Sequence, residues 1–254
     1  MKFGIRVYAL AAIWLGLVGL AWDDFALVWQ PVPAGIPGRM ILAYAVGALL
    51  ALGGAALLWQ RTVTLGAATL TMLYALGVLL LHVPKVIAHP FSFSPYSGVA
   101  EQLALVAGGL IAFASTAKID AAFAARLALA GRLAFGVCAV WFGLVHFHYP
   151  VDTASYIPKW IPPNQLFWAY ATGAAHIAAG LAILSGVLSR LAAYLLTAMF
   201  LVFQALIHAP LLMATPTSHF SWVMNGMNLA LVGAAWIVAD SLGGNDSGLR
   251  NSTD

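Results

Sequence analysis

Residues 39–60 read RMILAYAVGALLALGGAALLWQ, a run of 22 residues with one charged side chain, Arg39. A helix of this length is about 33 Å long, which is enough to cross the hydrocarbon core of a bilayer. Comparable apolar runs recur along the chain, and we expect spans at approximately residues 5–22, 39–60, 62–82, 98–117, 129–147, 165–187, 189–209 and 222–240. The sequence therefore predicts an all-α, polytopic membrane protein with eight transmembrane helices.

The composition excludes most other classes of protein. Of the 254 residues, 63% are hydrophobic and 7% are charged, whereas charged residues make up about 25% of a typical soluble domain. A soluble protein would need more charge to cover its surface, so membrane lipid is the expected surrounding. The net charge of +3 comes without a basic run, and we expect no nucleic-acid partner. The single cysteine, Cys138, excludes a disulfide within the chain.

An internal repeat is the strongest pattern in the sequence. Three pairs of segments match at an offset of 126 residues, and two further pairs match at 125 and 127. The three pairs are 43–48 with 169–174, 82–84 with 208–210, and 103–106 with 229–232. Since four crossings are an even number, two tandem four-helix bundles would share one orientation and be related by a pseudo-twofold axis along the membrane normal. The repeat also argues against a cleaved signal peptide in the first span.

The repeat sets the predicted domain boundaries. We expect a first four-helix repeat at residues 1–118, a cytoplasmic linker at 119–128, a second repeat at 129–240 and a disordered tail at 241–254. Eight of the eleven Lys and Arg residues would lie on the side that holds both chain ends. Because basic residues concentrate in cytoplasmic loops, both termini are predicted to be cytoplasmic, in a bacterial inner membrane.

Two histidines occupy equivalent positions in the repeats. His82 and His208 each precede a proline by two residues at the end of a predicted span. Neutral imidazoles at equal depth could hold a metal ion, a haem or a quinone oxygen. The alternative is that each histidine caps the carbonyls of a helix C-terminus.

The second repeat carries further candidates. His146 and His148 end a span, but a spacing of two places them on different helix faces unless the helix unwinds there. His176 aligns with Leu50 and lies deep in its span, where ionisable groups by default mark function, although it could also hydrogen-bond between helices. The last two candidates are Glu101, a proton acceptor or a helix-start cap, and Tyr170, for which packing is the alternative.

These residues form two predicted sets. The cofactor-binding set is His82, Glu101, Tyr170, His176 and His208. The metal set is His82, His146, His148 and His208. A quinone, a haem or a transition metal would fit such donors, and the sequence alone leaves the choice open.

One stretch of the second half resembles a known family. It runs from Gly143-Leu-Val-His146-Phe through Pro150 to Ile157-Pro158-x-x-Ile161-Pro162-Pro163, and continues into a small-residue helix with Tyr170 and Gly173. This pattern is similar to the DoxX/DoxD-like membrane proteins over about residues 130–240, and the first half looks like a diverged copy. The resemblance implies a four-helix membrane unit. One branch of that family is the membrane subunit of a thiosulfate:quinone oxidoreductase, and other members accompany redox or detoxification systems.

Three functions follow as hypotheses. The first is a quinone- or metal-linked redox component of the membrane, with an outward-facing histidine cluster. The second is a permease for a small, largely neutral solute that passes between the two repeats. The third is a non-catalytic membrane anchor for a periplasmic redox partner. Whether the protein is an enzyme stays open at this point.

Overall fold

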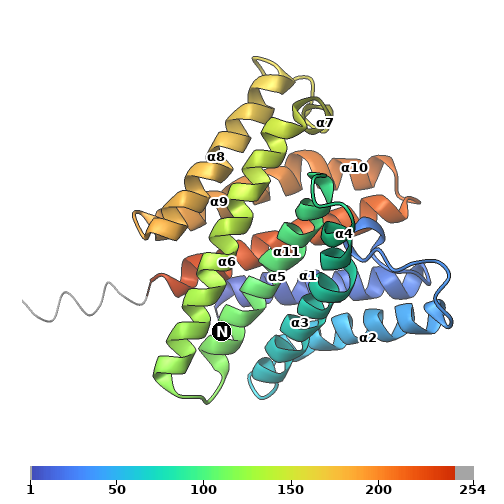
Figure 1. Cartoon of the computed structure of the whole chain (residues 1–254), viewed down its shortest axis with the longest axis vertical. Helices are drawn as coiled ribbons and strands as arrows, with labels where there is room; N and C mark the ends of the chain where they lie inside the picture. The colour runs from blue at the N-terminus through green and yellow to red at the C-terminus, as the bar shows by residue number, and fades with distance from the viewer. Residues whose placement is uncertain (1, 244–254) are drawn as a thin grey trace, which may run out of the picture.

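The computed structural model describes residues 2–243, and these contain eight helical segments long and apolar enough to cross a membrane (Figure 1). The segments are α1 (Phe3–Ala21), α2 (Arg39–Leu57), α3–η2–α4 (Val63–Ala88), α5 (Ser94–Thr116), α6 (Ala121–His148), α8 (Gln165–Ser185), α9–η3–α10 (Ser189–Ala214) and α11 (His219–Ser241). The described residues form no strand. The predicted all-α membrane fold with eight spans is confirmed.

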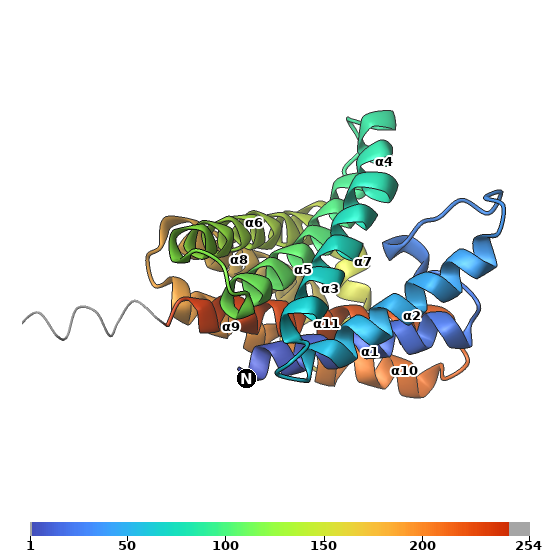
Figure 2. The same ribbon diagram turned by 90° about the horizontal axis from the view of Figure 1, so that it is seen from below.

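Neighbouring helices pack in an order that joins the two halves of the chain. Helix α1 lies between α2 and α11, whereas α5 packs against α3, α6 and α11 (Figures 1 and 2). Helix α8 lies between α6 and α9, and α9 returns to α11. Helix α11 is the most buried of the spans. The halves therefore share a long seam at α1–α11, α5–α11 and α5–α6. They do not stand apart as two separate bundles.

Glycines allow the closest helix approaches. A Cβ added to Gly16 of α1 would lie 2.5 Å from the carbonyl oxygen of Gly47 of α2. A Cβ added to Gly143 of α6 would lie at the same distance, 2.5 Å, from the carbonyl oxygen of Gly173 of α8. Small residues let transmembrane backbones meet in this way, and van der Waals packing then holds the helices together.

The third and seventh spans are longer than predicted, because each continues through its proline. A π-helical turn, η2 (Val78–His82) or η3 (Gln204–His208), precedes the short helices α4 (Val83–Ala88) and α10 (Ala209–Ala214). Proline offers no N–H and crowds the preceding turn. A π-bulge is one way in which a helix absorbs such a break. His82 and His208 therefore lie inside continuous helices, not at their ends.

Two predicted domain boundaries can be compared with the helix ends. Helix α6 begins at Ala121, where the Asp120 carboxylate accepts a hydrogen bond from the amide of Phe123, so most of the predicted linker 119–128 is helical. Helix α11 ends at Ser241, and nearly all of the predicted tail 241–254 lies outside the described residues. Lys2 Nζ donates to the carbonyl oxygen of Asp240 at 3.0 Å, which places the start of α1 beside the end of α11.

Candidate functional site

Two of the predicted histidines lie close together in the second half. His176 of α8 is 1% exposed, and its ring centroid lies 5.0 Å from that of His146 on α6, with the planes at 37°. The close approach of α6 and α8 brings them together, since a Cβ added to Gly173 would lie 2.8 Å from the His146 Cβ. We call these two residues the imidazole pair.

Both rings of the imidazole pair have a fixed tautomer. His146 Nδ1 lies 2.7 Å from the carbonyl oxygen of Phe142, and His176 Nδ1 lies 2.9 Å from that of Thr172. A carbonyl oxygen can only accept a hydrogen bond, so each Nδ1 must carry the proton. In a neutral ring the other nitrogen, Nε2, then holds a lone pair. The pair therefore offers two hydrogen-bond acceptors.

Three phenylalanines surround His176. The ring centroids of Phe142, Phe200 and Phe203 lie 6.0, 5.5 and 6.1 Å from the His176 ring. Phe142 and Phe200 are themselves buried. Apolar rings lower the local dielectric constant, and this strengthens any hydrogen bond that a ligand makes to the imidazoles.

An apolar groove adjoins the imidazole pair. It has a volume of about 330 Å³ and lies between α8, α9–η3 and the loop around Pro158. Thr172 and Phe203 belong to both features, because they line the groove and also contact His176. Trp168 lines the groove as well and donates its indole N–H to the carbonyl oxygen of Pro162 at 2.8 Å. We call this cavity the second-half groove.

The first half has a groove at equivalent positions, with a volume of about 220 Å³. Matching lining positions, 126 residues apart, include Val46 with Thr172, Leu76 with Val202, Leu80 with Leu206 and Leu81 with Ile207. The residues that correspond to the imidazole pair are Gly19 and Leu50. The groove is thus present in both halves, whereas the imidazoles belong to the second half alone.

His82 has a different environment. The Nε2–H of this buried residue donates to the carbonyl oxygen of Trp29 at 3.0 Å, and the Gln102 amide donates to the same oxygen at 3.0 Å. Its Nδ1 faces Gly98 so closely that an added Cβ would overlap the ring. In this arrangement His82 anchors η1 (Leu27–Trp29) to the helices behind it.

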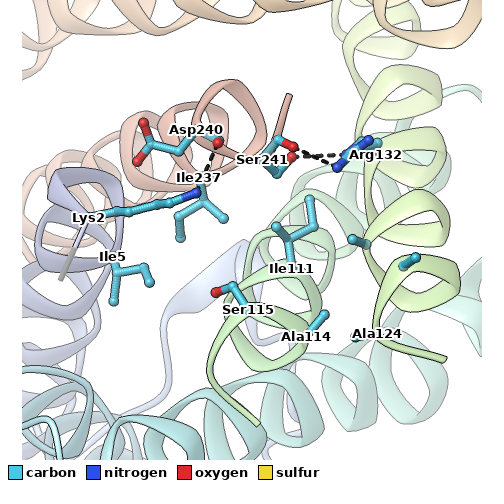
Figure 3. Close-up of a pocket in the computed structure, with 12 residues that line it drawn as sticks. Lys2, Ile5, Ile111, Ala114, Ser115, Ala124, Arg132, Ile237, Asp240 and Ser241 are labelled. Atoms are coloured by element: carbon cyan, nitrogen blue, oxygen red, sulfur yellow. Dashed lines mark hydrogen bonds between the residues drawn. The ribbon is translucent and has the colours of Figure 1, made fainter. Parts of the chain in front are cut away.

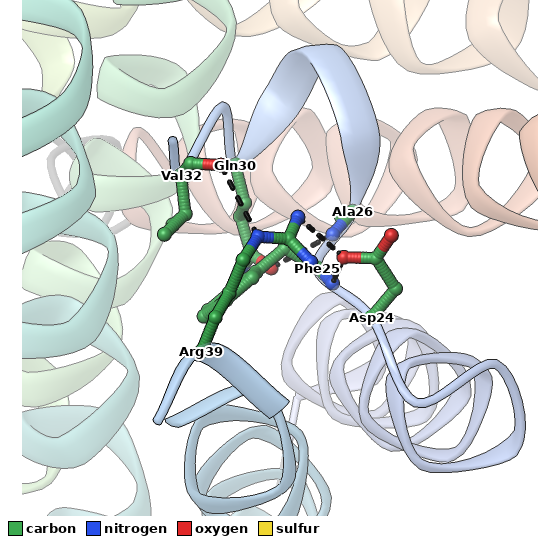
Figure 4. A network of polar contacts seen from close by, with 6 residues as sticks. All are labelled: Asp24, Phe25, Ala26, Gln30, Val32 and Arg39. Carbon is green, nitrogen blue, oxygen red and sulfur yellow. Dashed lines mark hydrogen bonds and ion pairs between the residues drawn. The ribbon is translucent and has the colours of Figure 1, made fainter. Parts of the chain in front are cut away.

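The loop that carries Trp29 is held by further polar contacts (Figure 4). Arg39 forms an ion pair with Asp24 at 2.6 Å and donates from Nε to the carbonyl oxygen of Val32 at 3.4 Å. Gln30 Oε1 accepts a hydrogen bond from the Ala26 amide at 3.0 Å. The loop places the Trp29 side chain beside the carboxyl group of Glu101. Glu101 therefore lies with the first-half anchor, away from the imidazole pair.

A network that the sequence analysis missed lies one turn before His208 in η3. The Nδ1 of His208 is buried without a hydrogen-bond partner among the described residues. One turn earlier in η3, Gln204 donates to Asn225 at 2.6 Å and accepts from Asn228 at 2.7 Å. Asn228 also donates to the carbonyl oxygen of Phe200 at 3.0 Å. These amides hold the helix that carries Phe200 against α11. The early signals were the amides of Gln204, Asn225 and Asn228 inside apolar spans.

The remaining candidates lie elsewhere. His148 is exposed and stacks on Phe93 at 4.3 Å, and α6 stays helical up to this residue, so His146 and His148 do not converge. Tyr170 is 43% exposed and contacts Phe147. Within residues 2–243, no group of three or more His, Cys, Asp or Glu side chains is placed to hold a metal ion. The predicted four-histidine metal set is not brought together.

Comparison with known proteins places the candidate site inside a family domain. Residues 121–209 match the family model described as DoxX. The match runs from the start of α6 to the beginning of α10 and includes both members of the imidazole pair. No curated protein and no solved structure matches the chain. The chain is thus similar to the DoxX family over residues 121–209, which confirms the resemblance for this part of the second half.

Proposed function

We propose that this DoxX-like membrane protein is a redox-associated component that binds a membrane quinol at the imidazole pair. The carrying observation is that the buried His176 lies 5.0 Å from the half-buried His146, and that Thr172 and Phe203, which contact His176, line an apolar groove of about 330 Å³. The quinol ring would lie against His146 and His176, and the isoprenoid tail would occupy the second-half groove. Ligand sites in proteins commonly combine such an apolar cavity with a few convergent polar groups.

The tautomers make the proposal specific for the reduced ligand. A quinol hydroxyl can donate a hydrogen bond to an imidazole Nε2, whereas a quinone carbonyl needs a donor that the neutral pair lacks. Each neutral hydrogen bond contributes about 0.5–1.5 kcal/mol, so two should favour the quinol on the order of tenfold to a hundredfold. A single metal ion would find only two imidazole ligands here, which favours the quinol over a metal.

Packing at the seam between the halves argues against a solute pathway. A Cβ added to Gly108 of α5 would lie 2.8 Å from the Cβ of Ala234 of α11. A Cβ added to Gly233 would lie 2.5 Å from the backbone of Tyr8 of α1. Helices in such close contact leave no room for a solute to pass between the halves at these positions. Quinol binding is therefore better supported than solute transport.

The proposal also treats the two halves as repeats with both chain ends in the cytoplasm. Three pairs of features at an offset of 126 or 127 residues support duplication: the two grooves, the two π-helical turns and the two glycine contacts Gly16–Gly47 and Gly143–Gly173. On this view, the second half acquired the imidazoles and the first half kept the apolar residues Gly19 and Leu50. The first-half groove, which lacks the imidazoles, then serves as a control for quinol binding in the second-half groove.

Equilibrium binding to the purified protein in lipid nanodiscs tests the function. The probes are a short-tailed benzoquinol and its oxidised form, measured by calorimetry under anaerobic conditions. We expect the quinol to bind at least tenfold more tightly than the quinone. His146→Ala and His176→Leu should each remove most of that preference, and Leu is the residue at the equivalent first-half position.

His148→Ala is the matched control, because His148 is an exposed histidine of the same helix and stacks on Phe93. It should leave both affinities unchanged. Equal affinity for quinol and quinone, or full quinol binding in the double variant His146→Ala/His176→Leu, would refute the proposal. Co-purification of a periplasmic protein by a chain that binds no quinol would favour the membrane-anchor function instead.

A further inference from the structure

Basic side chains gather at the C-terminal end of α11, on the side that holds the start of α1 (Figure 3). Arg132 of α6 donates from Nε to Ser241 Oγ at 3.0 Å and from Nη2 to the Ser241 carbonyl oxygen at 2.6 Å. Lys2 donates to the carbonyl oxygen of Asp240. Cations near a helix C-terminus complement its dipole, and this could be their whole role.

A cavity beside these residues suggests a second role. It has a volume of about 240 Å³ and opens between α1, α5, α6 and α11, with Lys2 and Arg132 at its rim (Figure 3). Its walls are apolar and include Ile5, Ile111 and Ile237. On the other side of Arg132 a wider hollow of about 780 Å³ lies between α6 and the α8–α9 turn. Arg132 lines both spaces.

The charge at this cavity is unbalanced. Asp240 is the one carboxylate that lines it, against the two cations Lys2 and Arg132. Among the described residues the ion pair within 4.0 Å is Arg39–Asp24, so neither Lys2 nor Arg132 is neutralised by a carboxylate at that distance. The guanidinium group of arginine has five N–H donors, and the hydrogen bonds to Ser241 use two of those of Arg132. Donors therefore remain for an anion.

Arg132 of α6 lies level with the end of another spanning helix, α11. Helix α6 has 28 residues and is about 42 Å long, which exceeds the hydrocarbon thickness of about 30 Å. Arg132 lies 11 positions after Ala121, or about 16 Å along the helix, and is level with Ser241 at the end of α11. The first turns of α6 thus extend beyond the end of α11, and Arg132 is level with the end of that span.

We infer that this cavity binds the headgroup of an anionic phospholipid. The phosphodiester accepts hydrogen bonds from Arg132 and Lys2, and an acyl chain lies along the apolar wall formed by Ile5, Ile111 and Ile237. Basic pockets between transmembrane helices on the cytoplasmic side bind anionic lipid headgroups in this manner. The site is separate from the imidazole pair, so it stands whether or not the protein binds a quinol.

Native mass spectrometry of the delipidated full-length protein tests the inference. The probes are phosphatidylglycerol and phosphatidylcholine with identical acyl chains, and inorganic phosphate in a separate arm. We expect phosphatidylglycerol to bind at least tenfold more tightly than phosphatidylcholine. Arg132→Gln should weaken its binding at least tenfold. Lys2→Gln, a change at an exposed position, should weaken it several-fold.

Arg61→Gln is the matched control, because Arg61 is an exposed cation of the α2–α3 turn that lines neither cavity. It should leave lipid binding unchanged. Equal binding of the two lipids would overturn the inference. So would an equal loss of phosphatidylglycerol binding in the Arg61→Gln and Arg132→Gln variants, or undiminished phosphatidylglycerol binding in Lys2→Gln. Millimolar inorganic phosphate that displaces the lipid completely would also overturn it, since the cavity would then be a site for free phosphate.

Discussion

Gly143→Ala perturbs the contact that brings the imidazole pair together. The added Cβ would lie 2.5 Å from both the carbonyl oxygen of Gly173 and the Cγ1 of Ile177. The isoleucine side chain can rotate, but the carbonyl oxygen belongs to the backbone of α8 and cannot move alone. Helices α6 and α8 must therefore separate, and His146 must move away from His176.

The size of the effect follows from the contact distance. Ordinary van der Waals contact begins at 3.4 Å, so the helices must shift by about 0.9 Å at this crossing. Overpacking of this kind costs about 1–3 kcal/mol. A displacement approaching 1 Å also misplaces two hydrogen-bond acceptors relative to one ligand, so quinol affinity should fall on the order of tenfold.

The assay measures thermal unfolding in detergent together with quinol affinity in nanodiscs. Gly16→Ala is the matched variant, since its Cβ would meet the Gly47 carbonyl oxygen at the same 2.5 Å in the first half. Both variants should lower Tm by a similar amount, but only Gly143→Ala should weaken quinol binding. Gly35→Ala, at a position with nothing within 4 Å of the new Cβ, should change neither. Equal quinol affinity in the Gly16 and Gly143 variants would refute the reasoning.

Three further changes have defined outcomes. Leu206→Trp fills the second-half groove and should abolish tail-dependent quinol binding. Leu80→Trp fills the equivalent first-half groove and should leave quinol binding unchanged. Similar quinol affinities in the two variants would contradict the placement of the isoprenoid tail in the second-half groove. Asn228→Leu deprives Gln204 and the Phe200 carbonyl of a hydrogen-bond donor. This loss should lower the free energy of unfolding by about 1–3 kcal/mol and lower Tm. An unchanged Tm would contradict a stabilising role of the amide network. Tyr8→Phe removes a buried hydrogen bond of 2.7 Å to the Leu105 carbonyl between α1 and α5. Its cost should be smaller, about 0.6 kcal/mol, and a loss above that of Asn228→Leu would contradict this ranking.

The eight spans could be predicted because they depend on length and apolar content alone. The continuation of two spans through Pro84 and Pro210 could not, since a proline after an apolar run normally indicates a helix end. In the structure, the π-helical turns at Val78–His82 and Gln204–His208 precede these prolines within continuous helices. His82 and His208 were therefore assigned to helix ends, whereas they lie within continuous helices.

The candidate site was predictable only in part. His146 and His176 were both identified, but their contact depends on how two helices cross, and histidine spacing within one helix carries no such information. The glycines Gly143 and Gly173 were the available signal. The roles of Gln204 and Arg132 were missed because the sequence pattern of a single polar residue in an apolar span is the same in all cases. It does not show whether the side chain faces a hydrogen-bond network, a cavity or lipid.

Photolabelling tests the central claim most directly. An azido-substituted benzoquinol is bound to the protein in nanodiscs, irradiated and located by mass spectrometry of the digested chain. The account predicts adducts within residues 157–176 and 199–207, which line the second-half groove and hold His176. It also predicts that His146→Ala/His176→Leu abolishes these adducts. Labelling confined to the first-half groove, within residues 42–81, or labelling that persists in the double variant, would contradict it.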